Sequence, residues 1–282
     1  MQPIFPTVGI VGTGAMGRGI AQMAVQAGSQ VLLFDLLPGA AEAARAALAD
    51  TWQKLVVKNK LTPEMQAAYL ARVSLASAVT GLAPCALVVE AIVEKLDVKQ
   101  RLFAELEAVA APQAVLATNT SSLSVTAIGA ALQRPAQLAG FHFFNPVPLM
   151  RVVEVIAGLK TSPVVCQQLT DYARQFGHTP VAAQDTPGFI VNHAGRGYGT
   201  EALRVVGERV ADFATIDRIL KDQMGFRLGP FELMDLTALD VSHPVMESIY
   251  HQYYEEPRYR PSVITAQRLA GGVVGKKVGE GF

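Results

Sequence analysis

The 282-residue chain has few cysteines, no excess charge of either sign and no long apolar segment. Its two cysteines, Cys85 and Cys166, lie far apart and match neither a metal-ligand nor a disulfide spacing, so we expect ordinary core thiols and no metal site. Lysine plus arginine and aspartate plus glutamate each number 24, which argues against a nucleic-acid or membrane-surface partner. No apolar run approaches the roughly 18 residues that a membrane span needs. Residues 1–6 lack a basic region and an apolar signal core, so we expect a soluble cytoplasmic protein.

A glycine pattern follows the first apolar run, residues 8–11, and reads Gly12-Thr13-Gly14-Ala15-Met16-Gly17. The first glycine permits a tight turn, the second lets the backbone approach a pyrophosphate, and the third lets the following helix pack closely on the strand. A helical pattern runs to about Ala27, with Gly28 at a C-cap position. Its N-terminus would offer N–H groups and a positive dipole end to phosphates.

An acidic residue, Asp35, ends the second apolar run, residues 31–34. It lies about 20 residues past the glycines, where a carboxylate binds a ribose hydroxyl in dinucleotide sites. A carboxylate there repels a 2′-phosphate, and no arginine follows it, so the sequence favours NAD over NADP. The alternative is a glycine-rich turn in some other doubly wound protein.

The alternation of strands and helices predicts an α/β fold, a Rossmann-type doubly wound sheet followed by an all-helical C-terminal domain. We place the boundary near Pro187, which gives an NAD-binding domain over 1–186 and a helical domain over 187–282 with a ligand cleft between them. In addition to the first strand, at residues 8–11, the expected strands are 31–34, 74–75, 87–91, 115–118, 138–144, 151–156 and 179–182. The expected helices are 15–27, 38–57, 63–70, 95–110, 124–132 and 161–176, then 190–207, 212–224, 230–255 and 263–269.

Polar clusters lie near the ends of three predicted strands, at residues 90–95, 118–122 and 141–146. A doubly wound sheet binds its ligands at this edge. In the third cluster, His142 suits the role of a base for alcohol oxidation, and Glu154, twelve residues on, is a possible cross-strand partner that fixes its tautomer. The alternative is a buried structural His–Glu pair.

Five ordered motifs resemble the L-3-hydroxyacyl-CoA dehydrogenase family over essentially the whole chain. They are the glycine pattern and Val88-Val89-Glu90-Ala91-Ile92-Val93-Glu94, Thr118-Asn119-Thr120-Ser121-Ser122-Leu123, Phe141-His142-Phe143-Phe144-Asn145-Pro146-Val147-Pro148 and Asp185-Thr186-Pro187-Gly188-Phe189-Ile190-Val191-Asn192. The segment 192–199 further resembles the phenylacetate-degradation branch, whose members oxidise 3-hydroxyadipyl-CoA. The resemblance implies NAD-dependent oxidation of an (S)-3-hydroxyacyl-CoA, such as 3-hydroxybutyryl-CoA or 3-hydroxyadipyl-CoA, to the 3-oxoacyl-CoA, and a homodimer formed through the helical domain.

The resemblance also implies roles for single residues. His142 would be the base and Glu154 its partner, while Ser121 and Asn192 would position the substrate oxygen. The residues expected to bind NAD are Gly12, Gly14, Ala15, Met16, Gly17, Asp35, Glu94, Lys99, Asn119, Ser121 and Asn145. Lys54 and Lys58 share a helix face and would meet the CoA phosphates, although a solvated lysine face is as reasonable.

Other features leave room for alternatives. Many relatives carry Arg and large apolar residues where this chain has His193 and a glycine-rich run, so Arg196 could meet a terminal carboxylate of the acyl group. We expect His178, His243 and His251 at the surface and the Ser122 hydroxyl in a turn or cap. The segment 275–282 stops where family members usually continue, and phenylacetate-branch relatives often carry a further C-terminal domain, which suggests part of a longer protein.

Three rival functions remain. One is another NAD-dependent hydroxyacid dehydrogenase of the same fold. A second is a hydrolase that uses Ser121, His142 and Glu154, although Thr120-Ser121-Ser122 does not match a Gly-x-Ser-x-Gly elbow. The third is a non-catalytic NAD-binding protein.

Overall fold

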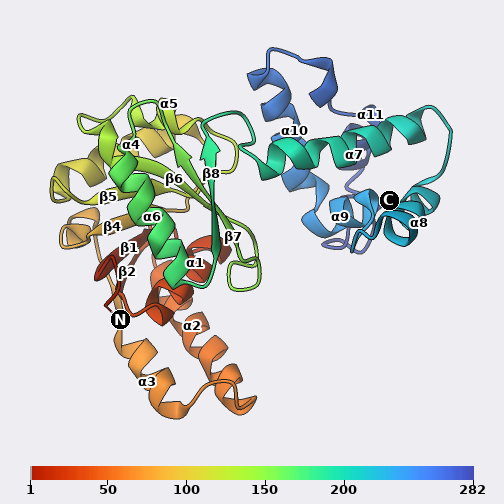
Figure 1. Cartoon of the computed structure of the whole chain (residues 1–282). Coiled ribbons are helices and arrows are strands. Elements are labelled where there is room, and N and C mark those ends of the chain that lie inside the picture. Colours follow the sequence, from red (N-terminus) through yellow and green to blue (C-terminus); the bar gives the residue numbers. More distant parts are fainter. Residues whose placement is uncertain (1) are drawn as a thin grey trace. The chain divides into compact units, whose positions relative to one another are not determined.

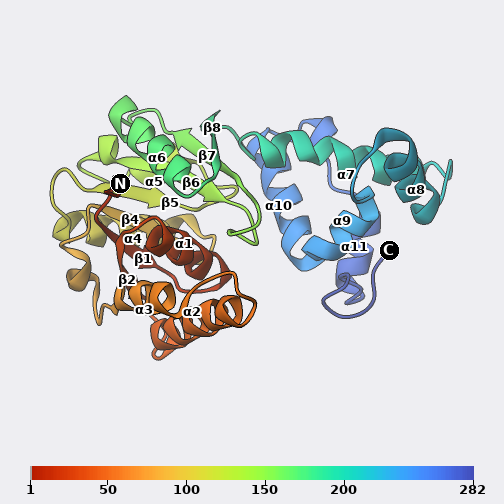
Figure 2. The ribbon, with the colours of Figure 1, turned by 60° about the horizontal axis from the view of Figure 1, so that its bottom comes forward.

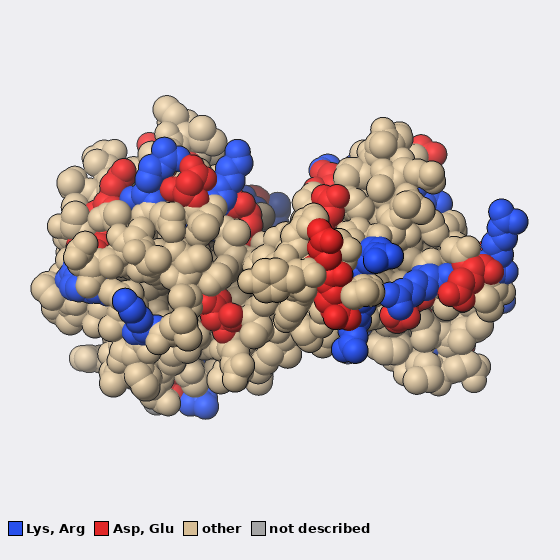
Figure 3. Space-filling model, turned by 90° about the horizontal axis from the view of Figure 1, so that it is seen from above, with Lys and Arg blue, Asp and Glu red and all other residues tan. Residues whose placement is uncertain are grey.

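The computed structural model describes residues 2–282 and divides into two compact units, which meet between Thr186 and Pro187. Among the described residues, no helix has both the length and the apolarity that crossing a membrane requires. On the face shown in Figure 3, lysine and arginine side chains lie interspersed with aspartate and glutamate.

The first unit is built on one sheet with the strand order β3-β2-β1-β4-β5-β6-β7-β8 (Figure 1). Neighbouring strands are parallel except β6 and β7, which are antiparallel. The strands are β1 (Thr7–Val11), β2 (Gln30–Phe34), β3 (Val73–Leu75), β4 (Leu87–Glu90), β5 (Val115–Thr118), β6 (Leu138–Phe143), β7 (Val152–Ala157) and β8 (Thr179–Gln184). The predicted, largely parallel α/β sheet is therefore present.

Helices cover both faces of this sheet (Figures 1 and 2). Because the chain leaves β1 in one direction and β4 in the other, right-handed crossovers place the two sets of helices on opposite faces. One core cluster joins buried residues of α1, α2 and α6, including Ile20, Trp52 and Tyr172. The helices are α1 (Ala15–Gln26), α2 (Ala40–Val57), α3 (Pro63–Ala71), α4 (Leu96–Val109), α5 (Val125–Gly129) and α6 (Pro163–Gln175), with 3₁₀ turns η1 (Val79–Leu82) and η2 (Pro135–Gln137).

The second unit is helical, as predicted. It contains α7 (Val191–Gly207), α8 (Phe213–Met224), α9 (Pro230–Thr237), α10 (Leu239–Gln252) and α11 (Val263–Ala270), with a 3₁₀ turn η3 (Pro257–Tyr259). Its core packs Leu203, Phe231 and Leu239 together. Asp217 on α8 accepts the N–H groups of Phe231 and Glu232, both at 2.9 Å, and so caps the first turn of α9.

The expectation of one helix over 230–255 is wrong, because the helix breaks at buried Ala238 with φ at +64°. No glycine or proline marks the break in the sequence. The C-terminal segment imposes it instead: Leu239 N–H donates to the Val274 carbonyl at 2.9 Å, and Lys276 N–H donates to the Asp235 carbonyl at 3.0 Å. The predicted start of the second helix at Pro38 is also early, since Gly39 caps α2 with φ at +80°.

Two of the three histidines expected at the surface are buried. His178 Nε2 lies 3.0 Å from the Val147 carbonyl oxygen, and His243 Nδ1 lies 3.0 Å from Thr265 Oγ1. In both cases one ring nitrogen has a tertiary hydrogen-bond partner, and sequence context alone does not reveal such a partner. His251 is exposed, as expected.

Candidate active site

The glycine loop lies between β1 and α1 at the carboxyl edge of the sheet, where β1 is flanked by β2 and β4. Gly12 has φ at +89°, in the left-handed region that favours glycine. A Cβ on Gly17 would lie 1.8 Å from the Gly12 carbonyl oxygen, so the loop and the helix can approach this closely only without a side chain.

Gly14 differs from the other two glycines, because the fold does not require it. It caps α1 with φ at −62°, and a Cβ built on it would meet no atom within 4 Å. The open space beside it therefore lies at the N-terminus of a twelve-residue helix whose first N–H groups favour a phosphate. This arrangement fits the pyrophosphate of a dinucleotide.

Asp35 follows β2 and reaches back to the glycine loop. Its carboxylate accepts the Thr13 N–H at 2.7 Å, the Thr13 hydroxyl at 2.9 Å and the Leu37 N–H at 3.0 Å. Partial burial raises its pKa, but the hydrogen bonds from Leu37 and Thr13 outweigh that effect and lower the pKa below its usual value. The side chain is therefore a carboxylate fixed beside the loop.

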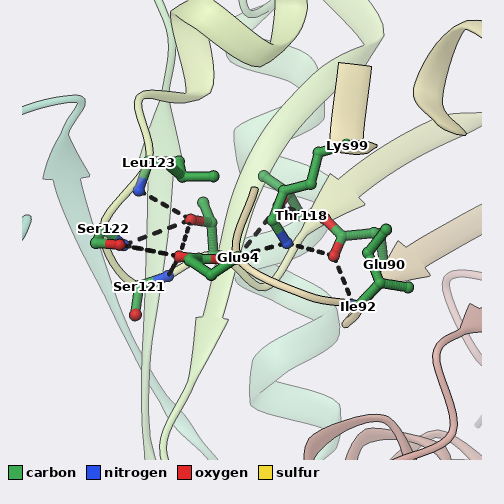
Figure 4. Close-up of polar contacts among 9 residues, drawn as sticks. Glu90, Ile92, Glu94, Lys99, Thr118, Ser121, Ser122 and Leu123 are labelled. Atoms are coloured by element: carbon green, nitrogen blue, oxygen red, sulfur yellow. Dashed lines mark hydrogen bonds and ion pairs between the residues drawn. The ribbon is translucent and has the colours of Figure 1, made fainter. Parts of the chain in front are cut away.

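A buried ion pair between Lys99 and Glu90 lies at the carboxyl ends of β4 and β5 (Figure 4). Lys99 on α4 is 1% exposed and its Nζ lies 2.5 Å from Glu90 Oε1 and 3.2 Å from Glu94 Oε2. Glu90 is fully buried and also accepts the Thr118 hydroxyl at 2.7 Å and the Ile92 N–H at 2.7 Å. Every charge in this pair therefore has a partner.

Glu94 organises the loop after β5. Its Oε1 accepts the Thr120 hydroxyl at 2.5 Å and the N–H groups of Ser121 at 2.9 Å and Ser122 at 3.2 Å. Burial raises its pKa, but Lys99 and the hydrogen bonds from Thr120 and Ser121 lower it below the usual value. The Ser122 hydroxyl also donates to Glu94, at 3.1 Å, while Figure 4 shows the Ser121 hydroxyl directed away from that carboxylate.

His142 and Glu154 form a buried pair on adjacent strands. They are directly opposite in the antiparallel β6–β7 ladder, and His142 Nδ1 lies 2.7 Å from Glu154 Oε2. His142 is 5% exposed and Glu154 is 0% exposed. The contact fits the tautomer in which Nδ1–H donates to the Glu154 carboxylate. The cross-strand contact predicted from the spacing is therefore present.

Asn119, which follows β5, forms hydrogen bonds to β6, the strand of His142, and to β4. Its side-chain oxygen accepts the Phe143 N–H at 2.9 Å, and its own N–H donates to the Glu90 carbonyl at 2.8 Å. Asn145 follows β6 and begins the turn before β7, with a cis peptide bond to Pro146. Both asparagines therefore lie at the same edge as the glycine loop.

The other predicted site residues lie elsewhere in the fold. Lys54 is in the last turn of α2, exposed and 2.7 Å from Asp50, and exposed Lys58 directly follows that helix. Asn192 belongs to the second unit, in the first turn of α7. The two cysteines are not candidates for catalysis, since burial raises the pKa of Cys85 to about 12 and raises that of Cys166.

Sequence reasoning assigned no individual role to the residues that hold the others in place. Thr13, Glu90, Thr118 and Thr120 make the bonds described above, and Asp185 fixes the start of α5 by accepting the N–H groups of Val125 and Thr126. A signal for burial was present at Lys99, the partner of Glu90. Lys99 precedes the apolar positions Leu102, Phe103 and Leu106 by three, four and seven residues, the spacing of one helix face.

Comparison with known proteins identifies both units. The family model described as "3-hydroxyacyl-CoA dehydrogenase, NAD binding domain" matches residues 7–186, and the one described as "3-hydroxyacyl-CoA dehydrogenase, C-terminal domain" matches residues 188–282. The NAD-binding domain predicted from the glycine pattern is thereby confirmed.

Three relatives represent the wider similarity. The chain is 43% identical to the 3-hydroxyadipyl-CoA dehydrogenase of Escherichia coli over 98% of its own length but only 58% of that protein. It is 39% identical to the probable 3-hydroxybutyryl-CoA dehydrogenase of Deinococcus radiodurans over 97% of this chain and 98% of that one. The crystal structure of (S)-3-hydroxybutyryl-CoA dehydrogenase from Ralstonia eutropha matches with a TM-score of 0.94 and 35% identity over 98% of both chains.

Proposed function

Since the chain belongs to the 3-hydroxyacyl-CoA dehydrogenase family of NAD-binding oxidoreductases that act on a CH–OH group, we propose that it oxidises an (S)-3-hydroxyacyl-CoA to the 3-oxoacyl-CoA. The observation that carries the proposal is the buried His142–Glu154 pair, with Nδ1 and Oε2 2.7 Å apart, on the strand beside the loop that Glu94 organises. Acyl groups with the 3-hydroxybutyryl and 3-hydroxyadipyl skeletons are the proposed substrates, because relatives with these names are 39% and 43% identical.

His142 acts as the base. Its Nε2 accepts the proton of the C3 hydroxyl while the C3–H bond breaks and a C3=O bond forms. Glu154 holds Nδ1–H in place and stabilises the imidazolium that results, and such a base contributes roughly 10²–10⁴-fold in rate. NAD⁺, when bound, supplies the acceptor for the hydride.

Ser121 and Asn192 position the substrate oxygen in this proposal. Ser121 suits the role because Glu94 fixes its backbone N–H at 2.9 Å while its hydroxyl is directed elsewhere (Figure 4). Asn192 would contribute from the first turn of α7. We further propose that Lys54 and Lys58 bind the phosphates of CoA.

The cofactor would lie along the carboxyl edge of the sheet. The loop from Gly12 to Gly17, including Ala15 and Met16, would hold its pyrophosphate, and Asp35 would hold its ribose. Lys99 is 1% exposed and pairs with both Glu90 and Glu94. It would therefore act on the cofactor indirectly, by holding Glu94 in place. Asn119 and Asn145 complete the proposed set near the nicotinamide.

We also propose a homodimer formed through the helical unit and a cytoplasmic location. Several large apolar side chains of that unit are exposed, among them Ile219, Met224, Leu236 and Val241. Sedimentation velocity tests whether the protein associates.

The location is proposed from the bacterial relatives described above, whose names give no compartment. Mammalian relatives at 37% identity are named as mitochondrial.

The test is NADH consumption with acetoacetyl-CoA, compared with NADPH and with His142→Gln. We expect NADH to be preferred and the variant to lose roughly 10²–10⁴-fold in kcat. His251→Gln is the matched control, because that histidine is exposed and outside the site. Nearly full activity of His142→Gln contradicts the proposed base. Release of CoA thiol without NADH use indicates the hydrolase instead.

A further inference from the structure

Arg196 on α7 has no acidic partner within its own unit. Among residues 187–282, no carboxylate oxygen lies within 4.0 Å of its guanidinium, whereas Arg204 on the same helix pairs with Glu201 at 3.2 Å. The side chain is nevertheless half-buried, and this burial lowers the pKa of Arg196 from its usual value. An arginine side chain keeps its charge in proteins. A guanidinium that is partly desolvated and lacks a counter-ion is suited to an anionic ligand.

The position of the guanidinium follows from one hydrogen bond. Arg196 Nε donates to the Asn192 carbonyl oxygen at 3.2 Å, which holds the side chain back over the first turn of α7. Helical side chains lean toward the N-terminus in this way, and residues four apart lie one turn, about 5–6 Å, from each other. The guanidinium therefore lies over the first turn of α7, which also carries Asn192.

The helix leaves space on either side of this arginine. Gly195 and Gly197 flank it, and a Cβ on either residue would meet no atom within 4 Å. Glycine inside a helix is about 1 kcal/mol less favourable than alanine, and no packing contact within 4 Å requires it at these two positions. The space beside these glycines can accommodate the end of a bound acyl chain next to the guanidinium.

From these observations, and resting on the proposed function, we propose that Arg196 binds a terminal carboxylate of the acyl group. The enzyme is then selective for 3-hydroxyacyl-CoA substrates with an acidic end over those with a methyl end. In a six-carbon dicarboxylic acyl group, the carboxylate carbon lies three bonds beyond the reacting C3. One acyl group can therefore present its C3 oxygen to Asn192 and its carboxylate to the guanidinium of Arg196, which folds back over the same turn of α7.

The experiment compares kcat/KM for three substrates: 3-hydroxyadipyl-CoA, 3-hydroxyhexanoyl-CoA and 3-hydroxybutyryl-CoA. The first two have equally long acyl chains and differ at the terminal group, so their ratio isolates the charge. A hydrogen bond to a charged group is worth about 1.5–3 kcal/mol. Arg196→Met is therefore expected to lower kcat/KM for the adipyl substrate about 10- to 100-fold and to change the other two less than about threefold. Arg196→Lys should recover part of the loss.

Arg204→Met is the matched control, since it removes a charge from the same helix two turns away and should leave the adipyl-to-hexanoyl ratio unchanged. Thermal unfolding of each variant separates loss of folding from loss of recognition. Equal loss for all three substrates in Arg196→Met, or an unchanged ratio, overturns the inference while butyryl turnover upholds the proposed function. Failure of the unaltered protein to act on any of the three overturns both.

Discussion

Replacement of Lys99 by methionine should destabilise the first unit strongly. The ammonium is 1% exposed and its partner Glu90 is 0% exposed, with 2.5 Å between Nζ and Oε1. Removing one member of such a pair leaves a buried charge without compensation, which costs about 3–5 kcal/mol. For a unit of this size, each kcal/mol lowers Tm by about 2–4 °C, so we expect a decrease of roughly 6–20 °C.

The chain offers a local probe and a matched control for this measurement. Its single tryptophan, Trp52, is fully buried on α2, so urea unfolding followed by its fluorescence reports on the first unit alone. Lys95→Met removes the same charge from an exposed position that directly precedes α4 and should change the free energy of unfolding by less than about 0.5 kcal/mol.

The double variant Glu90→Gln with Lys99→Met tests the physical reason. Both charges are then absent, and the glutamine oxygen can still accept the Ile92 N–H while its NH2 group donates to the Thr118 hydroxyl. We expect the double variant to be more stable than Lys99→Met alone, by about 1–3 kcal/mol. A Lys99→Met protein within 1 kcal/mol of the unaltered one, or a double variant less stable than the single, would refute the role assigned to this pair.

Three further predictions concern the cofactor site. Gly14→Ala should weaken NADH binding but leave the midpoint of urea unfolding unchanged, because the added Cβ meets no atom within 4 Å. Gly17→Ala should lower both the affinity for NADH and the unfolding midpoint, because its Cβ would lie 1.8 Å from the Gly12 carbonyl oxygen. Equal losses of stability in the two variants would contradict this contrast. Asp35→Asn should raise the KM for NADH about 10- to 100-fold and reduce discrimination against NADPH, since it removes a charged hydrogen-bond acceptor. Glu94 has a pKa below its usual value of 4.5, so its stabilising contribution is full above that pH and is lost as pH falls through the lower folded value. Glu94→Gln should therefore reduce the acid dependence of stability below about pH 4.5, and an unchanged acid limb would show that other groups determine it.

Local sequence signals predicted the helices and strands well where neighbouring residues alone determine their bounds. The strand at 115–118 has the predicted bounds, and Thr62, the residue before Pro63 at the start of α3, caps that helix by accepting the Met65 N–H at 3.2 Å. The His142–Glu154 contact followed from a short connection between two apolar runs, because antiparallel neighbours have a definite register.

The parts that could not be predicted depend on long-range contacts. The break at Ala238 arises from hydrogen bonds made by a segment some 35 residues later in the chain, so no local pattern encodes it. Lys99 shows a different difficulty. A lysine near a helix N-terminus is usually solvated, and only its coincidence with the apolar face and with an acid at the end of a buried strand points inward.

Two carboxylates share one structural task at the edge of the sheet where the ligand is expected. Asp35 accepts the Thr13 N–H, and Glu94 accepts the N–H groups of residues 121 and 122. Each fixes a loop that would otherwise present unpaired N–H groups, so each orders the site before any ligand arrives. Substitution of these acids should therefore raise the KM for NADH and lower stability together. His142→Gln, whose amide can still donate a hydrogen bond to Glu154, should lower kcat with little effect on either quantity. This difference distinguishes the groups that hold the site from the one that takes the proton.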